Sequence, residues 1–194
     1  MVVTSACAMT PAPAFVARPA CPLESSDHFY FPEDILPDSF ERQWYSEHLQ
    51  AMKEPSLSCG AIGESEVYRV TVLPSFSNPV SVRVSRRGGR YTARTIVLDG
   101  AGGYDPGNIM RENHQTISAD EWKRLKAAIE AADFWEEPTD APVHSDMIVV
   151  DGTQWIFEGS AKRYHVVVRH DTNMGLFDDL GEVFAELTET DKAP

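Results

Sequence analysis

Two arginines, Arg83 and Arg94, have the residue type and the spacing to bind an anion. They belong to two predicted strands joined by a turn at Gly88-Gly89, which sets them directly across from each other on one sheet face. Like charges opposed on a sheet are destabilising unless an anion lies between them, and the arginine fork suits a carboxylate or a phosphate. The pair therefore predicts a site for an anionic group of a partner, unless acidic residues of a helix or the solvent neutralise it.

The loop from Asp99 to Asn108, DGAGGYDPGN, combines oxygen ligands with four glycines that permit unusual backbone angles. Such oxygens suit calcium, but the spacing is not that of an EF-hand loop and its closing glutamate is missing. No Walker-type lysine follows, so a phosphate cradle is not indicated. We expect a partner-binding surface here; the alternatives are a calcium-dependent ligand-binding or hydrolytic site and a plain ordered turn. The expected binding residues are Asp99, Tyr104, Asp105 and Asn108, together with Arg83 and Arg94.

No constellation in the sequence predicts catalysis. His144-Ser145-Asp146 has the residue types of a triad, but neighbours in sequence do not converge in one. His165 is expected on a polar strand face, where solvation is the usual state and proton transfer the alternative. The sequence has no Gly-x-Ser-x-Gly elbow, no HExxH motif and no Cys/His spacing for zinc. We therefore expect no catalytic residues, no enzyme activity, no metal site and no cofactor other than the calcium alternative.

The elements that must position these residues are clearest between Asp146 and His170, which reads as three antiparallel strands. Asp151-Gly152 is a preferred two-residue hairpin turn. A second turn at 159–162 is expected to set Glu158 opposite Arg163. Because side chains alternate along a strand, one face is predicted as core and the other as a polar surface. The predicted core face holds Ile148, Val150, Trp155, Phe157, Tyr164, Val166 and Val168, and the polar face Gln154, Ile156, Glu158, Arg163, His165, Val167 and Arg169.

The rest of the chain predicts three helices and a second meander of three strands. Asp38 with Glu41, and Ser118 with Glu121, have the spacing of helix N-caps and capping boxes. The predicted fold class is α+β, with an antiparallel sheet or sheets built from two three-strand meanders in the order α-βββ-α-βββ-α. The helices are expected to end near 53, 133 and 187, and the first meander to span 67–73, 80–86 and 91–98.

Composition limits the partners. The chain has 194 residues with 42% hydrophobic content, enough for one domain with a core. Residues 1–26, rich in Pro and Ala, are expected to form a tether, and residues 27–194 a single α+β domain. Thirty acidic and 17 basic residues give a net charge of -13. Phosphate binding needs a basic footprint, so we expect a basic protein as the partner and no nucleic acid.

The N-terminal sequence MVVTSACA resembles the tail of a bacterial lipoprotein signal, with a small-residue pair before Cys7. Thr4 departs from the usual aliphatic residue, and a basic n-region and a long apolar h-region are missing. Export predicts a lipid anchor at Cys7 as the sole membrane attachment. It also predicts a Cys21–Cys59 disulfide that stabilises by about 3–4 kcal/mol. The alternative is a cytoplasmic protein with three unpaired thiols.

Three segments are familiar in combination: WYSEHLQAMKEPSL from Trp44, LDGAGGYDPGN from Leu98, and DGTQWIFEG with YHVVVRH between Asp151 and His170. Together they resemble small, exported, often lipoprotein-type bacterial proteins of unassigned function. The resemblance covers most of residues 40–188. It implies an α+β domain that is periplasmic or anchored to the outer membrane, and it carries over no catalytic residues. We therefore expect a non-catalytic envelope binding protein, in its sharpest form an immunity or inhibitor protein that neutralises a basic toxin or lytic enzyme.

Overall fold

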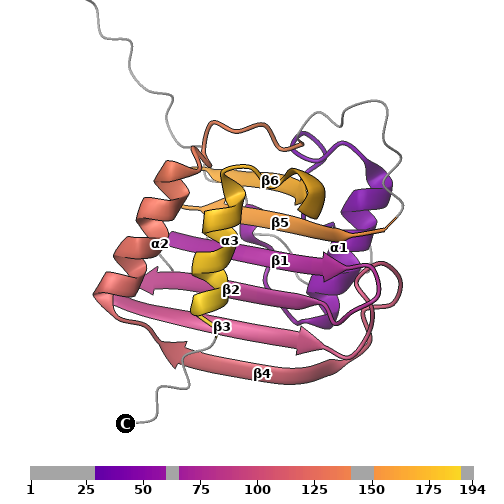
Figure 1. The fold of residues 1–194 in the computed structure, drawn as a ribbon, viewed down its shortest axis with the longest axis horizontal. Coiled ribbons are helices and arrows are strands. Elements are labelled where there is room, and N and C mark those ends of the chain that lie inside the picture. Colours follow the sequence, from indigo (N-terminus) through magenta and orange to yellow (C-terminus); the bar gives the residue numbers. More distant parts are fainter. Residues whose placement is uncertain (1–28, 60–65, 141–150, 189–194) are drawn as a thin grey trace, which may run out of the picture.

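The computed structural model describes residues 29–59, 66–140 and 151–188, and these form one six-stranded antiparallel sheet with helices on both faces (Figure 1). The strand order is β4-β3-β2-β1-β5-β6, so the predicted α+β class is confirmed. The strands are β1 Glu66–Pro74, β2 Val80–Arg87, β3 Arg90–Leu98, β4 Ile109–Thr116, β5 Thr153–Ser160 and β6 Tyr164–His170. The α-helices are α1 Ser39–Ala51, α2 Ala119–Ala131 and α3 Phe177–Glu186, with 3-10 turns at Leu57–Cys59 and Asp171–Asn173.

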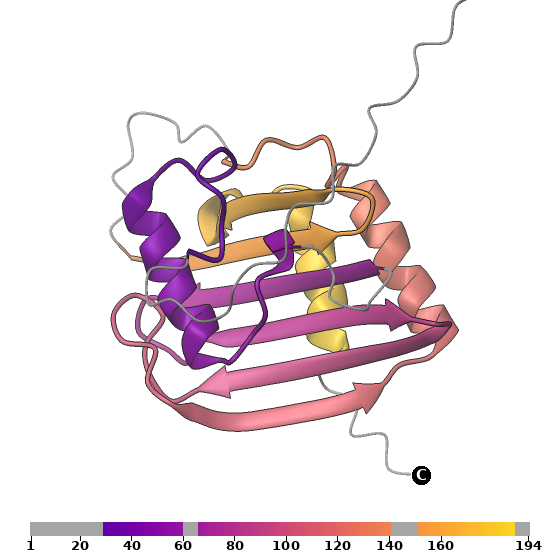
Figure 2. The ribbon, with the colours of Figure 1, turned by 180° about the vertical axis from the view of Figure 1, so that it is seen from behind.

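Both predicted helix starts are confirmed. The Asp38 carboxylate accepts hydrogen bonds from the first backbone N–H groups of α1, and Ser118 forms a full capping box with Glu121 at the start of α2. Helices α2 and α3 cover one face of the sheet in Figure 1, and the view from behind shows α1 across the other (Figure 2). The sheet is therefore the middle of three layers, and both of its faces must supply core residues.

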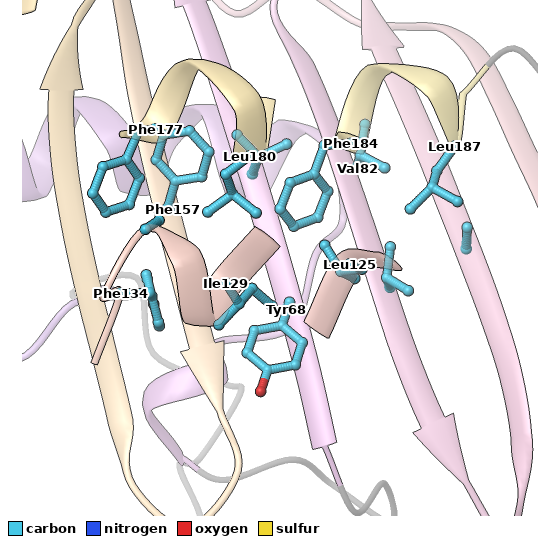
Figure 3. Close-up of a cluster of buried hydrophobic side chains, with 14 of the residues drawn as sticks. Tyr68, Val82, Leu125, Ile129, Phe134, Phe157, Phe177, Leu180, Phe184 and Leu187 are labelled. Carbon is cyan, nitrogen blue, oxygen red and sulfur yellow. The ribbon is translucent and has the colours of Figure 1, made fainter. Parts of the chain in front are cut away.

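The larger core lies between the sheet and the helices α2 and α3 (Figure 3). Phe157 of β5 is at its centre, with its ring 5.0 Å from that of Phe177 and 6.4 Å from that of Phe184. Leu125 and Ile129 of α2 fill the same layer from the other helix. The predicted core role of the strand aromatics is thus correct on this face.

A second core lies under α1, and it contradicts the predicted polar face. Ile156 is fully buried there beside Val166, Val168 and the α1 residues Tyr45 and Leu49. The predicted register is also wrong, because Glu158 pairs with Val166 and not with Arg163. The turn lies at 161–163, and this shift reverses the faces of β6: Val166 and Val168 face α1, whereas Val167 faces the larger core.

The first meander has four strands and not three, because β4 follows the loop 99–108 and pairs with β3. Its sequence, IMRENHQT, is mostly exposed and has no apolar alternation, so hydrophobic periodicity does not reveal it. The register that sets Arg83 opposite Arg94 is confirmed. The strand predicted from Asp146 lies outside the described residues, and the described elements follow the order α-ββββ-α-ββ-α.

We expect Phe157→Ala to reduce the free energy of unfolding by roughly 3–5 kcal/mol, because it removes the ring at the centre of the larger core. Urea unfolding followed by circular dichroism measures this. Leu176→Ala is the control, since Leu176 is an exposed apolar residue next to α3 and should change stability by less than about 0.5 kcal/mol. Equal, small effects of the two substitutions would contradict this packing.

Candidate protein-binding surface

The anion between Arg83 and Arg94 comes from the chain itself. Glu54 places Oε2 2.7 Å from the Nε of Arg83, and its Oε1 accepts a hydrogen bond from Nη1 of Arg94. The same Oε2 lies 3.2 Å from Nη1 of Arg69 on β1, so one carboxylate joins three neighbouring strands. This contact is the alternative in which an acidic residue of a helical segment neutralises the two arginines.

The end of α1 explains how Glu54 reaches the sheet. Lys53 adopts a left-handed conformation with φ 53°, its N–H bonds to Gln50 O, and the N–H of Glu54 bonds to Leu49 O. This pattern is the Schellman motif, which reverses the chain at a helix C-terminus. The reversal points the side chain of Glu54 down into the layer between α1 and the sheet, where the residue is 3% exposed.

Arg69 extends the cluster to the far side of β1. It is fully buried, and its Nε and Nη2 bind Oε2 of Glu158 at 2.7 and 2.5 Å. Tyr164 donates its hydroxyl to the other oxygen of Glu158 at 2.9 Å. Burial disfavours the charged guanidinium, but the carboxylates of Glu158 and Glu54 outweigh it and raise the pKa of Arg69.

For Glu54, too, the charged partners outweigh burial, and here they lower the pKa. Burial alone would raise the pKa of Glu54, but Arg69, Arg83 and Arg94 together hold it below its ordinary value. Arg94 also binds Glu112 of β4 through its Nε at 2.9 Å, so the cluster spans five adjacent strands, from Glu112 on β4 to Glu158 on β5. The cluster pairs its positive and negative charges within the protein, and its ion pairs hold the end of α1 to the sheet. A partner-binding role for Arg83 and Arg94 stays a prediction; their side chains are 16% and 11% exposed.

The loop 99–108 is a closed structure held by its own polar residues. Two hydrogen bonds join Asp99 and Asn108. The N–H of Asp99 donates to the carbonyl of Asn108 at 2.9 Å, and the N–H of Asn108 donates to Oδ1 of Asp99 at 2.6 Å. Inside the loop, the N–H of Ala101 donates to the carbonyl of Asp105 at 2.8 Å, and the N–H of Gly107 donates to the Asp105 carboxylate at 2.9 Å. The structure thus brings Asp99, Asp105 and Asn108 together, and their oxygens stabilise the loop.

The loop is docked against two other parts of the molecule. The N–H groups of Gly102 and Gly103 donate to the carbonyls of Ser77 and Ser75, in the turn between β1 and β2. A side chain at Gly102 would lie 2.6 Å from backbone atoms of Leu73, so this approach requires glycine. From the other side, Trp44 of α1 donates its indole N–H to Gly102 O at 2.7 Å.

This docking connects two aromatic pairs, Phe76–Tyr104 and Phe40–Trp44, of which Trp44 is half-buried. Tyr104 and Phe76 are 69% and 68% exposed, with ring centroids 5.9 Å apart. Phe40, also exposed, lies 6.1 Å from the ring of Trp44, the residue that holds the loop. We call Phe40, Trp44, Phe76 and Tyr104 the aromatic patch. Exposed apolar side chains that gather in this way mark interaction surfaces, whereas single ones need no explanation.

The sequence predicts Tyr104 as a binding residue but does not predict Phe76 or Phe40. A usable signal was present for Phe76, which lies in the polar turn segment SFSN where no core role is expected. For Phe40 no such signal exists, because its spacing from Trp44 fits the apolar stripe of a helix.

Three carboxyl groups, those of Asp38, Glu41 and Asp140, interact at the start of α1. Burial raises the pKa of Glu41 to about 7, and the carboxylates of Asp140 and Asp38 add to this effect. Asp99, Asp105 and Glu47 are exposed carboxylates on the loop and on α1. Loss of solvation is the larger cause of the pKa shift of Glu41, and the neighbouring carboxylates are the smaller one.

The remaining predicted sites have plainer positions. His165 is not on a solvated face: its Nε2 lies 2.9 Å from the carbonyl oxygen of Glu137, and its ring packs on Phe134 and Trp135. His144-Ser145-Asp146 lies outside the described residues. Cys59 ends a 3-10 turn, but Cys7 and Cys21 are outside the described residues, so the disulfide stays a prediction.

Within 29–59, 66–140 and 151–188, no group of three or more His, Cys, Asp or Glu residues is arranged to hold a metal ion. None of the helices in these ranges is long and apolar enough to cross a membrane.

Comparison with known proteins found no matching family model, no matching curated protein and no matching solved structure.

We expect Glu54→Gln to reduce the free energy of unfolding by roughly 3–5 kcal/mol, because it leaves three arginines without their shared carboxylate while one of them is fully buried. Glu112→Gln is the matched control. It also removes a carboxylate bound to Arg94, but Glu112 lies at the exposed rim, so its loss should cost much less stability than the loss of Glu54. Chemical denaturation distinguishes the two, and equal losses would show that Glu54 has no central role.

His48 predicts a pH dependence for the α1 layer. Burial lowers the pKa of His48 below its ordinary 6.5, although backbone bonds with Trp44 and Ala101 and the carboxylates of Glu47 and Asp105 act in the opposite sense. The unfolded chain therefore binds this proton more readily, and the stability contributed by neutral His48 is lost as pH falls from about 6.5 through the folded pKa.

The measurement is the difference in unfolding free energy between the protein and His48→Gln from pH 7.5 to 5. Glu41 is present in both proteins, so its opposite pH dependence cancels in the subtraction. The stability difference between the protein and His48→Gln should shrink as pH falls. A His114→Gln variant, changed at an exposed histidine of β4, serves as the control. A wild-type-minus-variant difference that stays constant with pH would rule out the buried neutral state of His48.

Proposed function

We propose that this chain is a non-catalytic binding protein of the bacterial envelope, an immunity or inhibitor protein that covers a basic toxin or lytic enzyme with the aromatic patch. The observation that carries the proposal is the exposed Phe76–Tyr104 pair, formed between the β1–β2 turn and a loop that is hydrogen-bonded on two sides. Aromatic anchors on a preorganised backbone are the usual centre of a protein interface, because little entropy is lost when they bind.

Charge supports a basic partner. The chain carries -13 overall, and the carboxylates of Asp99, Asp105 and Glu47 are exposed on the elements that bear the patch. Opposite charge accelerates encounter and makes association dependent on salt, while the aromatic contacts determine how long the complex lasts. An envelope location, with Cys7 lipidated and Cys21 paired with Cys59, belongs to the same proposal. It rests on the N-terminal sequence and the resemblance described above.

The test is capture from envelope extracts at low salt, followed by titration of the purified captured protein. We expect a basic protein whose affinity falls at least tenfold with Phe76→Ala combined with Tyr104→Ala, mainly through faster dissociation. Asp105→Asn keeps the acceptor for Gly107 and removes the charge, so it should slow association and weaken the salt dependence.

Leu176→Ala is the control, because it truncates an equally exposed apolar side chain outside the patch. The proposal fails if no basic partner is captured, or if the control reduces affinity as much as the double variant does.

A further inference from the structure

The two edges of the sheet are protected to different degrees. The edge at β6 is covered by the segment that follows α2: the N–H of Val168 donates to Thr139 O at 2.6 Å, and Asp140 forms a parallel bridge with Val168. Arg169 secures this cover through Glu137 at 2.8 Å. An edge covered in this way leaves few unpaired backbone N–H and C=O groups for another strand.

The edge at β4 has no such cover among the described residues, where β3 is its sole pairing strand. A strand paired on one side presents alternate N–H and C=O groups outward along its length. β4 has eight residues, no proline and no lysine, which are common means of blocking an edge. A register shift between Val97 and Leu98 marks a bulge near the start of β4, so the part that can extend the sheet regularly is 111–116.

The charges of β4 indicate what would pair with it. The strand has one arginine, Arg111, and one acid, Glu112, so it is neutral within a chain of net charge -13. A strongly basic partner has little to gain there, whereas a second copy meets no repulsion at this edge. We propose that β4 is the pairing edge for a second copy of this chain, antiparallel about a twofold axis, which joins two sheets into one of twelve strands.

The pleat and the charges determine the register. Opposed residues must point to the same face of a continuous sheet, so the axis passes through a residue and not between two. An axis at Glu112 would oppose two carboxylates. An axis at Asn113 places Glu112 of each copy opposite His114 of the other, which repeats across the interface the contact that Glu112 and His114 make at 2.8 Å within one strand. Of these two axes, the charges favour the one at Asn113.

The pairing is expected to be weak and dependent on salt. A single pair of eight-residue strands is a small interface, and each copy repels the other through its net negative charge. Sedimentation of the full chain should show a monomer–dimer equilibrium that shifts toward the dimer as salt rises. A chain that stays monomeric up to about 1 mM at high salt overturns the proposal.

Cysteine cross-linking tests the register. Asn113→Cys places the two thiols opposite each other at the axis, within reach of a disulfide after mild oxidation. Thr116→Cys is the matched control on the same strand: its two copies would lie about 20 Å apart in this register and cannot cross-link. Peptide mass spectrometry should find the link between residues 113 at least ten times faster than that between residues 116, and equal rates overturn the register.

A charge variant separates self-pairing from capture of a foreign strand. His114→Glu opposes two pairs of carboxylates and should weaken the dimer at least about fivefold, whereas His114→Gln should leave it nearly unchanged. Thermal melting of both variants verifies that the fold is retained. If His114→Glu leaves self-association unchanged, or if β4 binds only a different protein, the proposal is overturned; neither result affects the aromatic patch, which lies on other residues.

Discussion

The structure depends on one constraint: three arginines on adjacent strands point into the layer under α1 and need an anion there. Glu54 satisfies them with a single carboxylate, in contact with Arg69, Arg83 and Arg94. Because Glu54 follows directly after α1, the C-terminal end of the helix must lie over β1–β3. Such a buried cluster gives little net stability, since desolvation offsets most of the attraction. It does fix the placement of the helix, because any other placement would separate Glu54 from Arg69, Arg83 and Arg94.

The position of α1 in turn positions the aromatic patch. Trp44 lies two turns before the end of the helix, where its indole N–H reaches the carbonyl of Gly102. The loop is thereby held between α1 and the β1–β2 turn, and Tyr104 comes to lie beside Phe76. The ion-pair cluster at one end of the helix and the exposed aromatic pair beside the β1–β2 turn are thus connected through one rigid element. This explains why a loop with four glycines is ordered enough to hold an interaction surface.

Features that depend on neighbouring residues in the sequence could be predicted from it. The two helix caps, the Arg83–Arg94 register and the α+β class follow from residue spacing alone. The failures concern residues whose environment is set by distant parts of the chain. Glu54 looks like an exposed residue before proline until the fold brings Arg69 and Arg83 to it. In β6 the turn begins later than the Gly159 pattern indicates, and this reverses which valines face α1. The sequence of β4 has no alternation of apolar and polar residues, because solvent reaches both of its faces over most of its length.

The two proposed interaction surfaces are compatible because of where they lie on the sheet. β4 begins at Ile109, directly after the loop that bears Tyr104, so the patch and the pairing edge meet at one corner of each copy. Antiparallel pairing about Asn113 sends the two copies in opposite directions, which separates the two Ile109 residues by about 27 Å along the strands. The two patches would then lie at opposite ends of a twelve-stranded sheet, both uncovered. A dimer of this kind presents two binding surfaces, so a partner that is itself dimeric or held at the membrane gains avidity without any new contact.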